Sequence, residues 1–306
     1  MQVYAVDFAP FVLSKRGLFL TNSSPDKGKV MYQKEAAVQE EKPEKELTQE
    51  ERLTYLIKIL QAENSSPRFP PAKSYAEKKE LFRALMNVWQ GKSLPAAYFS
   101  IQDAYLQEEL KGKTVQKAED LEQIQKNISV WQGDIALLAA DAIVNAANKS
   151  LLGCLVPLHQ CIDNAIHSFA GLQLRIRCRE LICAQGHEEE TGQAKMTPAY
   201  NLPCQYVIHT VGPIVGEKLT KRDEDLLRSC YVSCMQRAAE KNLKSIAFCC
   251  ISTGVFHFPN RRAAEIAVET VKSCRQKFAP DMHVVFNVFK DRDLAIYTKL
   301  LQEDYP

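Results

Sequence analysis

The chain has no cysteine in its first half, because all ten cysteines lie between Cys154 and Cys274. A secreted disulfide scaffold is usually short and spreads its bridges along the chain, so we expect reduced thiols and a cytoplasmic location. No uninterrupted apolar run approaches the ~18 residues of a membrane-spanning helix, so no membrane partner is expected. The formal net charge is only +2, which gives no reason to expect nucleic acid, and any anion site must be local.

Residues 21–47 also lack the regular spacing of apolar residues that marks a helix or a strand, and they are polar and rich in Lys, Glu, Ser and Pro. The preceding stretch mixes apolar and basic residues, but Asp7 and Pro10 interrupt it and no clear cleavage site follows. We therefore interpret residues 1–47 as a disordered or loosely docked leader and linker, with an organelle-targeting peptide as the alternative.

Three amphipathic helices are expected between residues 48 and 112. Thr48 and Glu51 make a capping box at the start of the first helix. After a Pro- and Ser-rich loop at 64–76, residues 81–89 and 100–110 repeat apolar side chains at helical spacing. The apolar positions are Leu53, Leu56, Ile57, Leu60, Leu81, Leu85, Met86, Trp89, Ile101, Tyr105 and Leu106. Three short helices bury little apolar surface by themselves. We therefore expect residues 48–126 to form an all-helical extension that docks on a larger domain.

From residue 127 onward, β-rich runs alternate with helical patterns. The runs are ISVWQGDI, AIVNAAN, YVIHTVGP, SIAFCCIS and HVVFNVF, and the helical patterns lie at about 161–184, 224–241, 261–278 and 291–302. This alternation predicts an α/β domain over residues 127–306 with a mostly parallel central sheet. Ligands of such folds bind beyond the carboxyl ends of the strands, and the loops with polar motifs follow strands here.

A candidate metal site lies in the loop after the second of these runs. Cys154, His159 and Cys161 fall within eight positions, with Pro157 stiffening the loop between them. Two thiolates and one imidazole suit Zn²⁺ and leave its fourth coordination position open. On spacing alone, two ordinary buried cysteines beside a surface histidine are the alternative.

Several motifs in one order resemble the zinc-dependent branch of the ADP-ribose-binding macrodomains. They are NAAN, GC-x4-H-x-CIDNAIH and AG within residues 145–171, WQGDI at 131–135, AKMTPAYNLP at 194–203, HTVGP at 209–213, CCISTGVFHFP at 249–259 and FNVFKD at 286–291. The resemblance implies a three-layer macrodomain, and zinc as the ion held by the Cys-His-Cys trio. That family also carries a helical extension with a segment similar to RALMNV at 83–88.

The resemblance also implies which residues bind ADP-ribose. Asp134 would accept a hydrogen bond from the adenine amino group, with Ile135 beside it, although a lone Asp at a strand end is more often a helix cap. Phe289 would stack on adenine, with core packing as the alternative. The second diphosphate loop would be Ser252, Thr253, Gly254, Val255 and Phe256, with Phe256 beside the distal ribose.

Two catalytic residues are implied by the same resemblance. Asn148 would hydrogen-bond the distal ribose, and Asp163 would orient or deprotonate water, with a helix cap as its alternative. Asn145 is interpreted as satisfying backbone groups of its own loop. His167 and His209 are interpreted as structural.

The function implied is hydrolysis of mono-ADP-ribose from modified proteins with a bound zinc ion. Acidic side chains are the expected attachment points, and O-acetyl-ADP-ribose is a second expected substrate. The partners would be an ADP-ribosylated protein and ADP-ribose itself. Two alternatives are a reader that binds ADP-ribose without cleaving it, with a structural zinc, and an adaptor dominated by the helical extension.

Overall fold

A six-stranded sheet organises the main domain in the computed structural model, which describes residues 46–63, 69–91 and 94–303. The sheet order is β2-β8-β7-β4-β6-β5, and all strands are parallel except β5, which runs antiparallel to β6. The strands are β2 (Ile128–Gln132), β4 (Ala142–Ala146), β5 (Ala194–Pro198), β6 (Tyr206–Thr210), β7 (Ser245–Phe248) and β8 (His283–Val288). The predicted mixed, mostly parallel sheet is therefore confirmed, although β5 was not expected. A short parallel pair, β1 (Gln116–Lys117) and β3 (Leu138–Ala139), lies outside this sheet.

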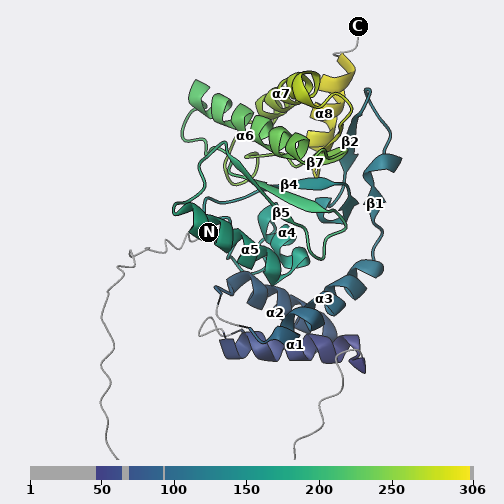
Figure 1. Ribbon diagram of the computed structural model, residues 1–306, viewed down its shortest axis with the longest axis vertical. Helices are drawn as coiled ribbons and strands as arrows, with labels where there is room; N and C mark the ends of the chain where they lie inside the picture. The colour runs from purple at the N-terminus through teal and green to yellow at the C-terminus, as the bar shows by residue number, and fades with distance from the viewer. Residues whose placement is uncertain (1–45, 64–68, 92–93, 304–306) are drawn as a thin grey trace, which may run out of the picture. The chain divides into compact units, whose positions relative to one another are not determined.

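Helices cover both faces of the sheet and complete three layers (Figure 1). On one face lie α4 (Ile162–Ala170) and α5 (Leu172–Gln185). The other face carries α6 (Lys221–Glu240), α7 (Asn260–Phe278) and α8 (Asp291–Glu303). The central strands bury apolar side chains toward both layers, and Ile143, Val144 and Ile208 are fully buried. Burial on both faces explains why these strands read as nearly continuous apolar runs.

The single helix expected at 161–184 is broken into α4 and α5 at Gly171. This residue has φ 94° and ψ 171°, a conformation that is almost restricted to glycine. A Cβ built there would lie 2.5 Å from Nε2 of Gln102, a side chain of the extension. The prediction of one continuous helix was wrong because its apolar spacing continues across the break.

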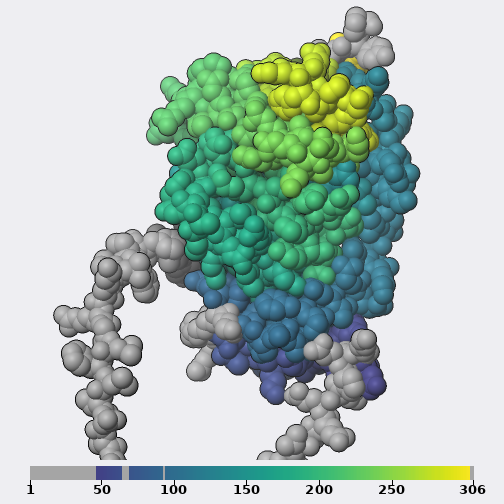
Figure 2. Space-filling model, viewed as in Figure 1, coloured from purple at the N-terminus to yellow at the C-terminus, as the bar shows by residue number. Residues whose placement is uncertain are grey.

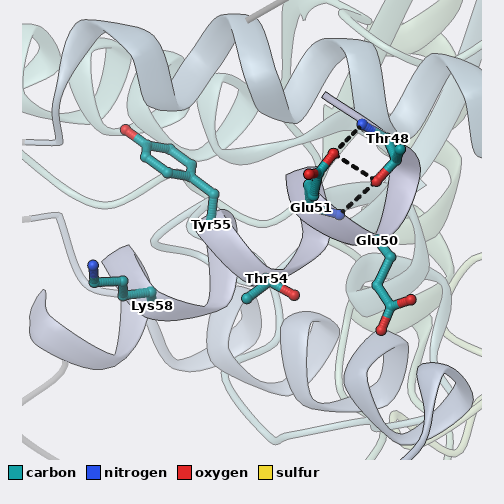
Figure 3. Close-up of a pocket in the computed structure, with 6 residues that line it drawn as sticks. All are labelled: Thr48, Glu50, Glu51, Thr54, Tyr55 and Lys58. Atoms are coloured by element: carbon teal, nitrogen blue, oxygen red, sulfur yellow. Dashed lines mark hydrogen bonds between the residues drawn. The ribbon is translucent and has the colours of Figure 1, made fainter. Parts of the chain in front are cut away.

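The extension forms three helices, α1 (Gln49–Glu63), α2 (Tyr75–Val88) and α3 (Ala96–Lys111). The Thr48–Glu51 capping box is confirmed, with Thr48 N donating to Glu51 Oε2 at 2.8 Å (Figure 3). Figure 3 also shows that these residues line a shallow hollow along α1, which none of the predicted site residues lines. The second helix begins earlier than expected, because Ser74 and Glu77 make an unrecognised capping box.

The three helices pack around a small apolar cluster of their own, which Leu172 of α5 completes. Through this shared cluster the extension packs against α5, and Figure 2 shows the purple-to-blue extension directly against the teal surface of the larger domain. The described residues of the extension and of the larger domain accordingly belong to one compact unit. The predicted leader falls almost wholly outside the described residues, and no described helix is both long and apolar enough to cross a membrane.

The order of the strands places one switch point between β4 and β7, which are neighbours in the sheet. The chain leaves β4 toward α4 on one face and leaves β7 toward α7 on the other. Loops that diverge from adjacent parallel strands in this way open the edge where ligands of α/β folds bind. The loops after β4 and β7 carry the predicted metal trio and the predicted diphosphate loop.

Candidate functional site

The loop between β4 and α4 brings the three predicted metal ligands together. Sγ of Cys154 lies 3.5 Å from Nδ1 of His159, and these two atoms and Sγ of Cys161 all lie within 4.8 Å of one another. Tetrahedral zinc with ordinary bond lengths sets a sulfur–nitrogen separation of about 3.5 Å. The side chains are therefore placed so that they could hold a zinc ion, and the two cysteines are half-buried next to the histidine, not in the core. Zinc at this site stays a prediction.

The two thiols of the trio differ in proton affinity. The hydrogen bond from Cys161 lowers the pKa of Cys154 to about 5, helped by the backbone at Val156 and by His159. The pKa of Cys161 is raised for the same reason, since it supplies the proton of that hydrogen bond. One thiolate is therefore ready to bind a cation, and a metal that binds both sulfurs displaces the remaining proton.

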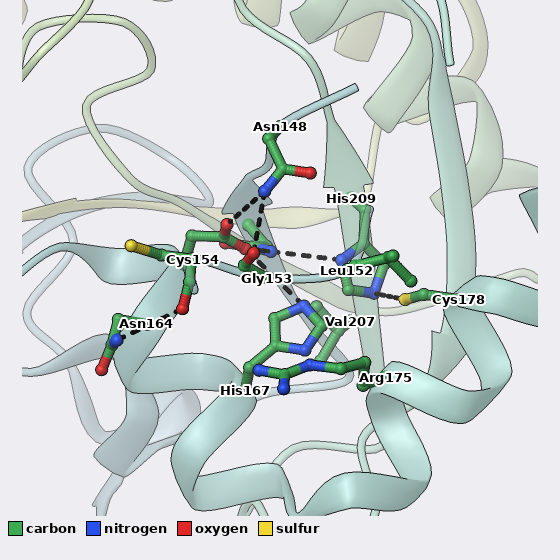
Figure 4. Close-up of polar contacts among 12 residues, drawn as sticks. Asn148, Leu152, Gly153, Cys154, Asn164, His167, Arg175, Cys178, Val207 and His209 are labelled. Atoms are coloured by element: carbon green, nitrogen blue, oxygen red, sulfur yellow. Dashed lines mark hydrogen bonds and ion pairs between the residues drawn. The ribbon is translucent and has the colours of Figure 1, made fainter. Parts of the chain in front are cut away.

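Two asparagine side chains, Asn148 and Asn164, donate hydrogen bonds to carbonyl groups of the loop that carries the trio, and Figure 4 shows both beside Cys154. Asn164 Nδ2 donates to the carbonyl oxygens of Val156 at 3.0 Å and Cys154 at 3.4 Å. Asn148 Nδ2 donates to the carbonyl oxygen of Gly153 at 2.9 Å. Gly153 has φ 79°, and a Cβ there would lie 2.6 Å from Cγ of His167. Glycine is thus required where the loop passes over the histidine ring.

Asp163 lies directly after the trio, in the first turn of α4. Its Oδ1 accepts from Asn145 Nδ2 at 2.8 Å, and its Oδ2 accepts from Asn148 Nδ2 at 3.4 Å. Burial raises the pKa of Asp163 to about 7. The helix-cap alternative is wrong, because the cap is Cys161, whose Sγ accepts from Asn164 N at 3.4 Å. Asp163 is a buried carboxyl held by two amides next to the trio.

The interpretation of Asn145 as a partner of loop backbone groups was wrong. Its amide nitrogen bridges two side chains, Asp163 Oδ1 and Nδ1 of His209, the latter at 3.2 Å. The residue is fully buried on β4, so it connects the sheet to the carboxyl at the site. Asn148 remains a predicted ribose ligand, and its Oδ1 already accepts a hydrogen bond from Ser150 at 2.7 Å.

A second group of candidate ligands, His167, Cys178 and His209, lies fully buried beneath the loop. Nε2 of His209 lies 3.0 Å from Oγ1 of Thr197. It also lies 3.7 Å from Sγ of Cys178, a contact that Figure 4 shows. Burial lowers the pKa of His209 to about 3, and burial together with the Arg175 guanidinium holds the pKa of His167 well below its usual range. His209 has hydrogen-bond partners on both ring nitrogens, whereas neither ring nitrogen of His167 has one, and its Nε2 lies 3.6 Å from Oδ1 of Asp163. The neighbouring Arg175 cation disfavours a metal ion here, so we interpret both histidines as neutral and structural.

The predicted adenine residues follow β2 and β8. Asp134 caps a short 3-10 helix, accepting from Ala136 N at 3.0 Å, so the cap alternative describes one of its contacts. Ile135 belongs to the hydrophobic core at 3% exposure. Phe289 is 76% exposed, which excludes core packing and leaves its ring free to stack. Their roles toward adenine stay predictions.

The predicted diphosphate loop follows β7 and is held by hydrogen bonds within itself and by one to Val215, in the segment after β6. Thr253 Oγ1 donates to the carbonyl of Cys250 at 2.9 Å, and Phe256 O accepts from Val215 N at 2.9 Å. In the described part of the chain, the N–H groups of Gly254 and Val255 have no hydrogen-bond partner, and Oγ of Ser252 is buried without one. Free N–H groups in such a turn suit an anionic ligand.

Several polar residues act on the site through other residues and were not among the predicted site residues. Asn145, Asn164 and Arg175 are fully buried beneath or beside the trio, and Arg83 and Asn87 reach it from the extension. The signal available in the sequence was a polar residue within a helical segment that is otherwise apolar. The segment RALMNV at 83–88 contains two such residues, Arg83 and Asn87.

The observed fold and site define a three-layer α/β domain with its polar loops gathered at a strand switch point. Residues 144–267 match the Macro domain family model. A protein-ADP-ribose hydrolase of Treponema medium is 49% identical over 262 residues, covering 83% of this chain and 100% of that protein. A Staphylococcus aureus protein of the same name is 46% identical over 256 residues, covering 83% and 96%.

Solved structures agree with the sequence relatives. A Trypanosoma brucei macrodomain solved in complex with ADP-ribose has 29% identity and a TM-score of 0.55, covering 76% of this chain and 97% of that chain. The chain belongs to the macrodomain family.

Burial of His209 predicts a loss of stability in mild acid. Its folded pKa lies near 3, below the unfolded value of about 6.5, so the unfolded state binds the extra proton as pH falls through this window. We expect His209→Gln to make the fall of the unfolding free energy between pH 6.5 and 5 shallower by about 1 kcal/mol per pH unit.

Urea denaturation at several pH values measures this change in slope. Asp163, His167 and Cys178 face the same region and remain in both proteins, so the comparison isolates His209. His187→Gln, on an exposed turn, is the control. An unchanged slope in His209→Gln would contradict the buried, neutral imidazole.

Proposed function

We propose that the protein is a hydrolase that removes ADP-ribose from modified proteins with a zinc ion held by Cys154, His159 and Cys161. One observation carries the proposal: the trio converges directly beside the buried carboxyl of Asp163, at the switch point between β4 and β7. A possible metal ligand set and a buried carboxyl at one edge are the components of metal-assisted hydrolysis.

We propose that ADP-ribose lies across the carboxyl ends of the parallel strands. Adenine would lie at Asp134 with Phe289 over its face, and the diphosphate would meet the free N–H groups of Gly254 and Val255. Ile135, Ser252 and Thr253 would complete these contacts. The distal ribose would then reach Asn148 and Phe256 beside the metal loop.

Water would cleave the bond between the distal ribose and the modified side chain. Asp163 would orient the water and take its proton while the hydroxyl adds to the anomeric carbon of the ribose and the bond from that carbon to the side-chain oxygen breaks. The proton held by Asp163 would then pass to the leaving carboxylate. Asn145 and Asn148 hold the carboxyl in place from two sides. Bound zinc would supply Lewis-acid polarisation beside the ribose.

The relatives support the hydrolytic half of the proposal. Two of them are named protein-ADP-ribose hydrolase, and this chain spans nearly their whole length. We propose mono-ADP-ribose on acidic side chains as the substrate, with O-acetyl-ADP-ribose as a second one. A reader of ADP-ribose would use the diphosphate loop, but it has no need of a buried carboxyl held by two amides beside a metal trio.

Removal of the metal should abolish release of ADP-ribose while the fold survives. We expect one zinc per chain in the purified protein, and a loss of both zinc and single-turnover release with a chelator or in Cys161→Ser. Zinc added after the chelator should restore release. Cys183→Ser changes an exposed cysteine of α5 and is the matched control.

Elemental analysis and release of labelled ADP-ribose from a modified protein measure both quantities. Binding of ADP-ribose without any release by the parent protein would favour the reader. Release that persists in metal-free Cys161→Ser would contradict the role of zinc.

Asp163→Asn should separate catalysis from binding. The substitution keeps the shape of the side chain but removes its capacity to take a proton from water, so single-turnover release should fall about 10²–10⁴-fold. The dissociation constant for ADP-ribose should change less than about threefold, well under the 1.4 kcal/mol that a tenfold change represents. Calorimetry gives the second number, and an undiminished rate would remove Asp163 from the chemistry.

Asp134→Ser tests the adenine contact without removing the helix cap. A serine at this position can still accept from Ala136 N, while the carboxylate is lost. A hydrogen bond to a charged group contributes about 1.5–3 kcal/mol, so ADP-ribose should bind roughly 10–100-fold more weakly. Calorimetric titration measures this affinity, with Asp225→Ser on the exposed surface of α6 as the control. Equal affinities for ADP-ribose would place adenine elsewhere.

A further inference from the structure

The helical extension reaches the metal loop through Asn87, at the end of α2. Oδ1 of Asn87 accepts from the backbone N–H of Leu158 at 3.0 Å, and Nδ2 donates to Oγ of Ser168 on α4 at 3.0 Å. Asn87 is 1% exposed, so water does not replace these bonds. A residue more than seventy positions earlier in the chain therefore holds the residue directly before the candidate ligand His159.

The backbone at Leu158 requires such a contact. Its φ is 55°, a left-handed conformation that a leucine rarely adopts. Its side chain is 40% exposed, so apolar packing does not fix this conformation. The hydrogen bond from Leu158 N to Asn87 holds this turn together with the backbone hydrogen bond from His159 N to the carbonyl oxygen of Val156 at 3.2 Å. Of the two, only the bond to Asn87 comes from the extension, and the turn sets the direction of His159.

A second contact from α2 acts on the other end of the loop through Asn164. Nε and Nη2 of Arg83 donate to Oδ1 of Asn164 at 3.3 and 2.9 Å. These bonds orient the amide so that its Nδ2 faces the carbonyl groups of Cys154 and Val156. The guanidinium also lies over the ring of Phe169, 5.6 Å from its centroid. The Cys154 end of the loop is thus also fixed from the extension.

Helix α2 is itself anchored to the main domain at its carboxyl end. Nη1 of the buried Arg175 donates to the carbonyl oxygens of Met86 and Trp89, each at 2.6 Å, and of Asn87 at 3.1 Å. These carbonyls carry the partial negative charge of a helix end, which a cation stabilises. These hydrogen bonds from Arg175 fix the end of α2 and so position Asn87 next to Ser168 of α4.

We propose that Arg83 and Asn87 of the extension are positioning residues for the metal centre, so that metal affinity depends on α2. This proposal takes from the proposed function only that the metal is zinc. The contacts of Arg83 and Asn87 with the loop do not depend on it. The extension is then part of the site's support and not a separate adaptor. Outer contacts that orient ligands in metal sites change metal affinity typically about 10–100-fold when removed.

Matched substitutions separate this role from general docking. Asn87→Leu and Arg83→Met keep side-chain bulk and remove the bonds to the loop. Gln107→Met is the control, because Gln107 Nε2 joins the extension to Asn201 at 3.2 Å without contacting the loop. In the full chain, zinc affinity measured by chelator competition should fall about 10–100-fold in the first two variants and less than about twofold in the control.

Affinities within about twofold of the parent in folded Asn87→Leu and Arg83→Met would overturn the proposal. An equal loss in Gln107→Met would also overturn it, because docking alone would then explain the effect. If Asn87→Leu does not fold, Arg83→Met decides the question.

Amide hydrogen exchange of the metal-free chain gives a second readout that does not need zinc. Exchange at residues 155–161 should be at least about tenfold faster in Asn87→Leu or Arg83→Met than in the parent and Gln107→Met. If the parent binds no zinc, the proposed function loses its metal, while exchange still decides whether α2 holds the loop. Unchanged exchange would overturn the positioning role.

Discussion

The shape of the metal loop depends on the hydrogen bonds that the buried side-chain amide of Asn164 donates to two of the loop's carbonyl groups. A loop that folds back on itself beside a helix must satisfy its own carbonyl groups, since a buried unpaired carbonyl is costly. Asn164 is fully buried, pairs with two of these carbonyls, and receives the guanidinium of Arg83 on its own oxygen. The convergence of two thiols and an imidazole is therefore a consequence of side-chain hydrogen bonds outside the trio.

Electrostatics beneath the loop follow from the same burial. Asp163 and Arg175 bring opposite charges into an interior where His167 and His209 stay neutral. The carbonyl groups at the end of α2 fix the guanidinium of Arg175. The extension therefore helps to set the electrostatic potential at the carboxyl group of Asp163. A buried charge is tolerated only when such partners are in place. The main domain and its extension are therefore interdependent at the site as well as in their apolar packing.

Much of this fold could be predicted from the sequence because its signals are local. Buried parallel strands give apolar runs, and the Thr48–Glu51 pair marks a helix start. Strand β5 escaped prediction because AKMTP mixes polar and apolar residues at an antiparallel edge. The break at Gly171 escaped because the apolar period continues through it, and only its backbone conformation and contact with Gln102 reveal the need for glycine.

The candidate metal ligands could be predicted because their residue types carry the chemistry, whereas their supports could not. Asn145 and Asn87 are ordinary asparagines in sequence, and their partners lie on other elements of the fold. Zinc-edge X-ray absorption of the purified chain tests the central claim most directly. The account predicts two sulfur neighbours at about 2.3 Å and one imidazole nitrogen at about 2.0–2.1 Å. A shell of oxygen and nitrogen without sulfur would contradict it.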